Sequence, residues 1–135
     1  MRLERLRLFG DQLALAWAVT AGDVVHVAGM TGMLVDFAAP TLSSYTYPNG
    51  IEAQMRQCYR NIGWILRSVG ADLVDIADQT LFFVGDHQEA TAATNIVRRD
   101  VFGDRPPASA LVGVASLHDR ACVLEMKVVA YRGAG

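Results

Sequence analysis

Apolar and polar side chains alternate most regularly near the end of the chain, over residues 122–131. Successive side chains of a strand point to opposite faces of its sheet. The even-numbered face is wholly apolar and is expected to lie on a core; it consists of Leu124, Met126, Val128 and Ala130. The odd-numbered face carries Glu125 and Lys127, the only lysine of the chain, in an otherwise aliphatic run. Two interpretations are open: a charged pair on a half-solvated sheet, or a carboxylate in a cleft between sheets, where its pKa could suit acid–base chemistry.

Shorter apolar runs predict further strands. These are expected over residues 2–9, 13–19, 24–28, 76–84 and 109–115. The first of them would be an edge strand. Gly22 and Asp23 form a hairpin signal between the second and third strands, and a turn is expected over residues 30–33. A polar turn over residues 118–120 precedes the final strand.

Two stretches have the period of a helix. Over residues 51–69, apolar side chains recur every three or four positions on one stripe, which consists of Ile51, Met55, Cys58, Ile62, Ile65, Leu66 and Val69. Gly70 supplies the stop of this helix. Asp86 and Glu89 form a capping-box pattern that begins a second helix, and this helix runs to about Phe102 before two prolines break it.

The predicted order is two or three strands, a helix, a strand, a helix and two strands, which is an α+β arrangement. A long loop, residues 34–50, precedes the first helix and is expected to be either a lid or a wrapping segment. So few helices cannot cover both faces of a sheet, so both should lie on one face. The other face is then apolar and bare, which predicts an oligomer, because a monomer rarely leaves such a patch open.

Composition favours one globular domain over residues 1–135. The chain is 52% hydrophobic and has a net charge of −2, which is typical of a folded protein of this length. Its N-terminal arginines, Arg2, Arg5 and Arg7, are interleaved with leucines, so no basic cluster favours nucleic acid. No apolar run approaches the roughly 18–20 residues of a membrane span. We therefore expect neither nucleic acid nor a membrane as a partner.

The start of the chain imitates a signal peptide, with basic residues before an apolar run. Glu4 and Asp11 interrupt that pattern, and cleavage after Ala21 would remove a predicted strand. Cys58 and Cys122 lie in helical and strand patterns and lack the spacing of metal ligands. A cytoplasmic location and the absence of a bound metal are the expectations.

Several stretches together resemble the Rid (YjgF, reactive intermediate deaminase) family. They are residues 22–29 with Thr31-Gly32, residues 52–57 with Asn61-Ile62, residues 69–75, Asn95 after the capping box, and Pro107-Ala-Ser109 through Tyr131. Together they cover about residues 13–131, which is nearly the whole chain.

The resemblance implies a YjgF/chorismate mutase-like fold, in which a six-stranded, mostly antiparallel sheet has two helices on one face. It also implies a homotrimer, whose bare sheet faces close into a barrel with ligand clefts between neighbouring subunits. The best-known members hydrolyse imines and enamines derived from amino acids, release ammonia, and use no metal or cofactor. In them an arginine clamps the substrate carboxylate, and a glutamate on the last strand handles a water or a proton.

Carried onto this sequence, the glutamate falls on Glu125 and a substrate-holding glycine turn falls on residues 29–32. Ser109 occupies the position of the arginine, and Leu15 occupies that of a tyrosine near the first strand. A serine has neither the charge nor the reach of a bidentate clamp. We therefore expect little hydrolysis of ordinary amino-acid imines, and a substrate that lacks the carboxylate or presents it differently.

The expected cleft has Glu125 as its catalytic residue. Its expected substrate-binding residues are Ser109, Gly29, Thr31, Gly32, Leu15, Leu111, His118, Arg105 and Arg120. Arg105 lies four residues before Ser109, and Arg120 lies in the turn before the last strand, so either could reach the cleft.

Three functions are compatible with these residues. The first is a cofactor-free hydrolase, deaminase or isomerase of a small imine, enamine or related carbonyl compound, with Glu125 as acid or base. The second is a protein that binds a small metabolite in the same cleft without chemistry. The third is a Schiff base on Lys127, which needs a lowered pKa that a neighbouring Glu125 would oppose. A carboxylate in an apolar strand is costly unless it is used or paired, which favours the first. The family has also carried a ribonuclease label, which the acidic balance of this chain supports little.

Overall fold

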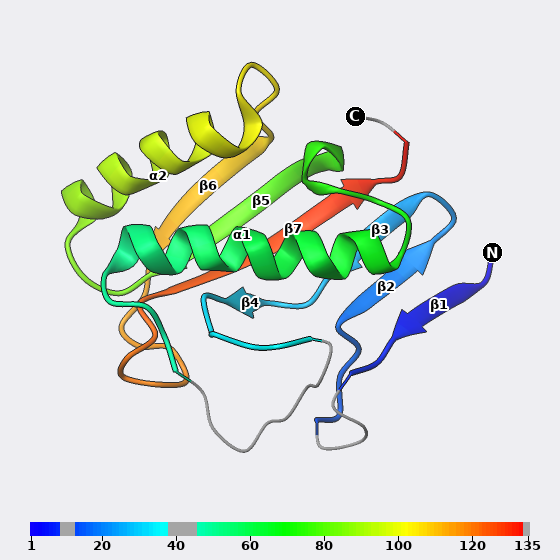
Figure 1. The fold of residues 1–135 in the computed structure, drawn as a ribbon, viewed down its shortest axis with the longest axis horizontal. Coiled ribbons are helices and arrows are strands. Elements are labelled where there is room, and N and C mark those ends of the chain that lie inside the picture. Colours follow the sequence, from blue (N-terminus) through cyan, green and yellow to red (C-terminus); the bar gives the residue numbers. More distant parts are fainter. Residues whose placement is uncertain (9–12, 38–45, 134–135) are drawn as a thin grey trace.

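The structure is a computed structural model that describes residues 1–8, 13–37 and 46–133. Within these residues, two α-helices lie on one face of a seven-stranded sheet (Figure 1). The helices are α1 (Ile51–Ser68) and α2 (His87–Phe102), with a short 3-10 helix, η1 (Leu73–Asp75), after α1. The strands are β1 (Leu3–Leu6), β2 (Ala18–Ala21), β3 (Val24–Val27), β4 (Met30–Thr31), β5 (Ile76–Phe83), β6 (Ala108–Gly113) and β7 (Leu124–Tyr131). The α+β fold with both helices on one face is confirmed.

The strand β7 is the centre of the sheet. The strand order is β1-β2-β3-β7-β5-β6, and β4 also pairs with β7. All of these pairs are antiparallel except the parallel pair of β5 and β6. The even-numbered side chains of β7 are buried beneath the helices, as the alternation predicted; they are Leu124, Met126, Val128 and Ala130. The stretch with the clearest strand pattern therefore organises both halves of the sheet.

The strand predicted over residues 13–19 is wrong for most of its length. Strand β2 begins only at Ala18, and the predicted hairpin turn follows it at Gly22, whose φ of 60° suits glycine. The carbonyl of Trp17 accepts a hydrogen bond from the N–H of Ala28 at 2.9 Å, at the end of the ladder. The residues before Trp17 leave the sheet, and two of them line a pocket instead.

The seventh strand occupies residues that the sequence predicted as a turn. Met30–Thr31 (β4) pairs with Met126 and Glu125 of β7. Six strands were expected, and β4 accounts for the additional one. A two-residue strand leaves no periodic pattern, so its pairing depends on tertiary contacts and not on its own sequence.

Polar side chains of α1 hold β4 in place. Asn61 donates from Nδ2 to the carbonyls of Thr31 (3.1 Å) and Met33 (2.9 Å). Cys58 donates from Sγ to the carbonyl of Met30 at 3.2 Å. Because these groups are buried, each bond avoids the cost of a desolvated, unpaired carbonyl. The asparagine of the family-like stretch therefore has a structural role.

Gln54, one turn before Cys58, fastens α1 to the approach of β7. Its Nε2 donates to the carbonyls of Pro48 (3.0 Å) and Ala121 (2.7 Å), and its Oε1 accepts from the N–H of Val123 (2.9 Å). The backbone of this residue also lies very close to Gly32, where a Cβ would stand only 2.3 Å from the carbonyl oxygen of Gln54. Only glycine allows this approach of β4 to α1.

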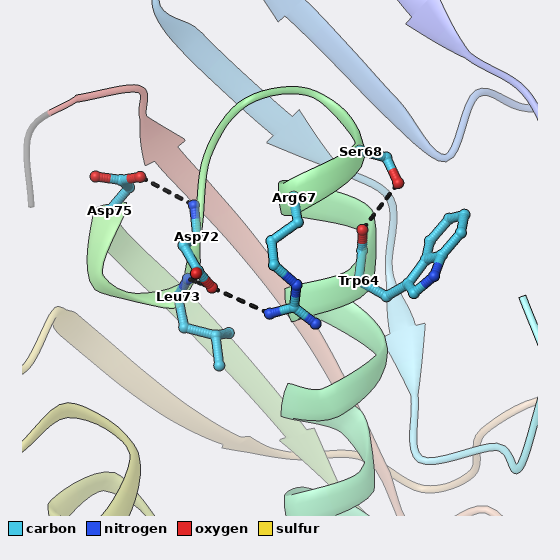
Figure 2. A network of polar contacts seen from close by, with 6 residues as sticks. All are labelled: Trp64, Arg67, Ser68, Asp72, Leu73 and Asp75. Atoms are coloured by element: carbon cyan, nitrogen blue, oxygen red, sulfur yellow. Dashed lines mark hydrogen bonds and ion pairs between the residues drawn. The ribbon is translucent and has the colours of Figure 1, made fainter.

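The connection after α1 is built from the stretch at residues 69–75, shown in Figure 2. Gly70 has a φ of 84° and follows the last turn of α1, as predicted. Asp75 accepts from the N–H of Asp72 at 2.9 Å, and Asp72 accepts from Arg67 at 3.2 Å. The bond between Asp75 and Asp72 is one half of a capping box at η1, in which the side chain of Asp72 also accepts from the backbone N–H of Asp75, and η1 leads into β5.

The other face of the sheet carries no helix in the residues that the structure describes (Figure 1). We call it the open face. Strand alternation and register assign to it Leu3, Arg5, Val19, Ala21, Val24, His26, Thr31, Asp78, Thr80, Phe82, Ala108, Ala110, Val112, Glu125, Lys127, Val129 and Tyr131. Val112 and Tyr131 are 39% and 46% exposed, which is high for apolar and aromatic side chains. The bare face expected from the sequence is present, with charged groups among its apolar residues.

Candidate active site

Glu125 lies in the middle of β7 on the open face. It pairs with Phe82 of β5 on one side and with Thr31 of β4 on the other, and it is half-buried. Gly29 comes so close that a Cβ there would lie 3.0 Å from Glu125 Oε2. In residues 1–8, 13–37 and 46–133, no hydrogen bond or ion pair joins this carboxylate to another residue. A partly desolvated carboxylate without a protein partner is a candidate for ligand chemistry.

A β-bulge creates the close approach of Gly29. The β3–β7 ladder ends with His26 opposite Val129, and the β4–β7 ladder begins with Met30 opposite Met126. Four residue steps on one side therefore match three on the other, so residues 27–29 contain one extra residue. Bulges bend a strand and redirect its side chains, and they are frequent beside active sites.

Lys127 is bound to the backbone at this bulge. Its Nζ donates to the carbonyl of Val27 at 2.6 Å, and burial lowers the pKa of Lys127. In the described part of the chain, no ion pair joins Lys127 to Glu125. The two side chains thus occupy separate surroundings on the open face, and the interpretation as a charged pair along the sheet does not fit this arrangement.

Glu125 and Gly29 line a pocket of about 300 Å³. The other lining residues are Leu13, Leu15, Trp17, Met30, Thr31, Met33 and His118. The walls are mostly apolar, and Glu125 is the one carboxylate among these described lining residues. Such a pocket can hold an apolar group of a small molecule while it presents a carboxylate and a histidine at one side.

Five residues predicted for the cleft meet in this pocket, which we call the Glu125 pocket. They are Glu125, Gly29, Thr31, Leu15 and His118. Sequence reasoning missed Leu13, Trp17, Met30 and Met33, because it assigned them to a strand and a turn. The one sequence signal that groups three pocket residues is the alternation of large side chains with alanines at positions 13, 15 and 17, although these residues do not form a strand.

His118 connects the Glu125 pocket to the segment before α1. Tyr47 Oη and His118 Nε2 lie 3.0 Å apart, and the two rings meet edge to face. Tyr47 belongs to the loop that the sequence predicted as a lid or wrapping segment, of which residues 38–45 lie outside the described residues. The described end of that loop therefore contacts a wall of the pocket.

Ser109 and Leu111 lie on β6, which β5 separates from β7. Ser109 Oγ accepts from Gln79 Nε2 at 3.2 Å, and Gln79 Oε1 accepts from the hydroxyl of Tyr59 at 2.7 Å. The side chain of Ser109 therefore faces the helix layer, away from the open face. Within one chain, Ser109 does not meet Glu125.

The remaining residues predicted for the cleft also lie elsewhere. Gly32 packs against α1, and Arg105 is exposed in the turn between α2 and β6. Arg120 lines a different pocket of about 390 Å³, together with residues from the N-terminal ends of both helices. Neither arginine is among the residues that line the Glu125 pocket.

The described residues offer neither a metal site nor a membrane-spanning helix. Among residues 1–8, 13–37 and 46–133, no group of three His, Cys, Asp or Glu side chains is placed to hold a metal ion. The same residues contain no helix that is both long and apolar enough to cross a bilayer. Cys58 and Cys122 are buried, as their patterns predicted, and this burial raises the pKa of both thiols.

Similarity to known proteins identifies the family of this chain. The sequence profile of the family described as Endoribonuclease L-PSP matches residues 13–132. This chain belongs to that family, the Rid (YjgF) family. The sequence resemblance is therefore confirmed at family level.

Named relatives of this Rid-family chain include two imine deaminases. A 2-iminobutanoate/2-iminopropanoate deaminase of Rattus norvegicus is 25% identical over 120 residues, which cover 89% of this chain and 81% of that protein. The protein of the same name from Bos taurus is 27% identical over 116 residues, which cover 86% and 78%. A crystal structure of a YjgF/YER057c/UK114 family member from Mycobacterium tuberculosis has a TM-score of 0.78 at 23% identity, covers 96% of this chain and 99% of its own, and shows the same fold.

Proposed function

We propose that this Rid-family protein is an enzyme that acts on a small imine, enamine or related reactive carbonyl compound in the Glu125 pocket. One observation carries the proposal: a half-buried carboxylate with no partner among the described residues stands in a mostly apolar pocket. Membership of the family, and the names of the two deaminases, support this class of reaction. Glu125 is the proposed acid–base residue, and Thr31 and His118 are the proposed polar contacts of the substrate.

Hydrolysis of a protonated imine requires a base for water and then an acid for the nitrogen. In the proposed first step, water adds to the C=N carbon while Glu125 takes one of its protons, which leaves a neutral carbinolamine. Glu125 then returns the proton to the nitrogen, and the C–N bond breaks. The hydroxyl proton passes to the departing ammonia, so the products are a carbonyl compound and ammonium. One water is consumed, and the carboxylate is regenerated.

The lining of the Glu125 pocket favours a substrate without a carboxylate. Its described lining residues include neither arginine nor lysine, and Ser109 stands where the family resemblance places a clamping arginine. Within one chain, a substrate carboxylate in this pocket would lie beside Glu125 with no lining cation, and like charges in a small pocket repel each other by several kcal/mol. An imine with an apolar substituent is the better match to Leu15 and its apolar neighbours.

We also propose that the chain works as a homotrimer, with its open faces turned inward. Exposed apolar side chains on the open face, such as Val112, support a covered face, and the family resemblance supports three subunits. Light scattering should then return about three times the chain mass of 14.6 kDa. A monomer mass at all micromolar concentrations would contradict this assembly.

Replacement of Glu125 by glutamine tests the enzymatic proposal. Imines would be produced in the cuvette by an amine or amino-acid oxidase, and the carbonyl product would be followed over time. The wild-type protein should hydrolyse an apolar imine faster than 2-iminobutanoate or 2-iminopropanoate. Glu125→Gln should reduce that rate by about 100-fold, the scale for loss of a general acid or base. Glu4→Gln, on the exposed edge strand of the same sheet, is the matched control and should leave the rate unchanged.

Other outcomes separate the remaining functions. Normal turnover by a folded Glu125→Gln variant would refute the catalytic assignment. Binding of the imine or carbonyl compound by the wild-type protein without any turnover would favour the non-catalytic binding protein. Loss of assembly in the variant would instead make Glu125 a structural residue of the subunit interface.

A further inference from the structure

A second groove lies on the helix side of the sheet, where α2 ends. Its lining residues are Asn95, Arg98, Arg99, Gly103, Pro106 and Pro107, and its volume is about 410 Å³. None of these residues belongs to the Glu125 pocket, and the chemistry proposed there does not use them. We call it the arginine groove.

Positive charge in the arginine groove is not neutralised by the described residues. No acidic residue is among its lining residues. The carboxylate of Asp100, next to Arg99 in sequence, is already engaged by Arg56 at 2.7 Å. In the part of the chain that the structure describes, neither Arg98 nor Arg99 forms an ion pair. The groove therefore presents two guanidinium groups that form no ion pair with a described carboxylate, including Asp104 in the turn beside them.

Arg98 is held in position. Its Nη2 donates to Asn95 Oδ1 at 2.8 Å, and the residue is half-buried on α2. A guanidinium has five N–H donors, so four remain for a ligand. Burial raises the pKa of Tyr59 well above its usual value, while its bond to Gln79 and the positive charge of Arg98 oppose that rise. Arg98 therefore stands near the Tyr59–Gln79–Ser109 hydrogen-bond chain.

The opposite wall of the groove is a turn with little freedom to rearrange. Gly103 has a φ of 60° and donates its N–H to the carbonyl of Arg99 at 3.0 Å. Arg105 donates its N–H to the carbonyl of Phe102 at 3.1 Å, and two prolines with fixed φ follow. A preformed wall reduces the ordering cost of binding.

We propose that the arginine groove binds an oxyanion, either a carboxylate or a phosphate group, with Arg98 as its main ligand. The planar fork of arginine matches both groups with two parallel hydrogen bonds. The C-terminal end of α2 opposes an anion with about half a negative charge, but two full positive charges on Arg98 and Arg99 outweigh it. The alternative role of the two arginines, stabilising that helix end alone, predicts no saturable anion binding.

Titration followed by amide NMR tests the proposal on the full chain. Inorganic phosphate and acetate would be added separately, with sodium chloride reduced so that ionic strength stays constant. We expect saturable shifts at residues 95–107 with a dissociation constant of about 1 mM. Arg98→Ala should weaken binding by tenfold or more, as expected for a lost charge-assisted pair, and Arg98→Lys should weaken it less.

Arg60→Ala is the matched control. Arg60 is exposed on α1 and likewise donates to an amide oxygen three residues earlier, Gln57 Oε1, at 3.1 Å. Arg60→Ala also removes one positive charge, but at a position outside the arginine groove. It should leave anion binding unchanged. Thermal melts of the variants separate lost binding from lost folding, and Arg98→Lys keeps the test valid if Arg98→Ala does not fold.

Each outcome decides the proposal. Saturation by phosphate alone assigns a phosphorylated ligand, and saturation by acetate alone assigns a carboxylate. The proposal is overturned by the absence of saturation below about 50 mM, by unchanged affinity in both Arg98 variants, or by an equal loss in Arg60→Ala. The last result would show general charge attraction and no site.

Discussion

The polar side chains on the two faces of the central sheet differ in how completely they are hydrogen-bonded. Between the sheet and α1, the buried polar side chains Gln54, Cys58 and Asn61 each bond to the backbone. On the open face, Glu125 has no partner among the described residues, and Lys127 has one carbonyl. Polar residues of the family-like stretches thus divide into two sets. One completes the hydrogen bonding of the fold, and the other leaves a carboxylate available for a ligand.

Two glycines give the strongest test of this division. Gly32→Ala should destabilise the protein by more than about 3 kcal/mol, because its Cβ would collide with the backbone of Gln54 on rigid α1. Gly29→Ala would meet only the end of the Glu125 side chain at 3.0 Å, which can move. It should cost little stability but reduce turnover. Urea denaturation measures the loss of unfolding free energy in both variants. An equal loss in the two would refute the difference between the two faces.

Asn61 and Glu125 provide the next comparison. Asn61→Ala leaves the carbonyls of Thr31 and Met33 buried without their donor, and should cost about 3 kcal/mol of unfolding free energy. Glu125→Gln breaks no bond among the described residues and should change stability by less than about 0.5 kcal/mol. Similar losses in calorimetric melts of the two variants would mean that Glu125 also serves the fold.

Alkaline pH should weaken the buried layer through its two thiols. Burial raises the pKa of Cys122 from an ordinary 9.0 to about 11, and burial also raises the pKa of Cys58 well above its ordinary value. The unfolded chain then releases protons near pH 9 while the folded chain retains them, so stability falls as pH rises. Between pH 8 and pH 10 each thiol should lower the free energy of unfolding by about 1.4 kcal/mol. Urea denaturation of Cys122→Ala at both pH values should show a smaller loss of unfolding free energy between them than the wild type shows. An equal loss in the two proteins would contradict the role of Cys122.

The smallest expected effect concerns Lys127 on the open face. Burial lowers its pKa, so in the alkaline range the folded chain releases this proton before the unfolded chain does. Stability from this group therefore rises with pH up to about 10.5, which is opposite to the thiols. Solvent exposure limits the gain to about 0.5 kcal/mol at most. The pH dependence of the unfolding free energy would be measured for the wild type and for Lys127→Met. The contribution of the thiols is the same in both proteins, so the difference reports Lys127 alone. A difference of the opposite sign would contradict this account.

Elements with a long periodic pattern were predictable from the sequence. The buried face of β7, the apolar stripe of α1 and its end at Gly70 all follow from alternation, helical period and turn chemistry. These signals are local, since each depends on residues within one element. The placement of both helices on one face followed from their number alone.

Features made by contacts between distant segments were not predictable. The pairing of β4 depends on α1, and the capture of Lys127 depends on the bulge at residues 27–29. The two-residue spacing along the strand suggested a Glu125–Lys127 pair. In the structure Lys127 donates instead to the carbonyl of Val27 at the bulge. The resemblance located Ser109 and Glu125 in the chain without locating them relative to each other. Strand β5 lies between them within one chain, and their side chains point to opposite faces of the sheet.

The central position of β7 also shapes the order in which the protein can form. Of the described strands it is synthesised last, yet β3 and β5 both pair with it. Until it leaves the ribosome, the nascent chain has two separate strand groups, each with an unpaired edge and an apolar surface. Closure then joins residues about a hundred positions apart, such as Val25 and Ala130, and such distant pairings slow folding. The nascent protein thus passes through a stage in which chaperones can recognise it and aggregation competes with completion of the sheet.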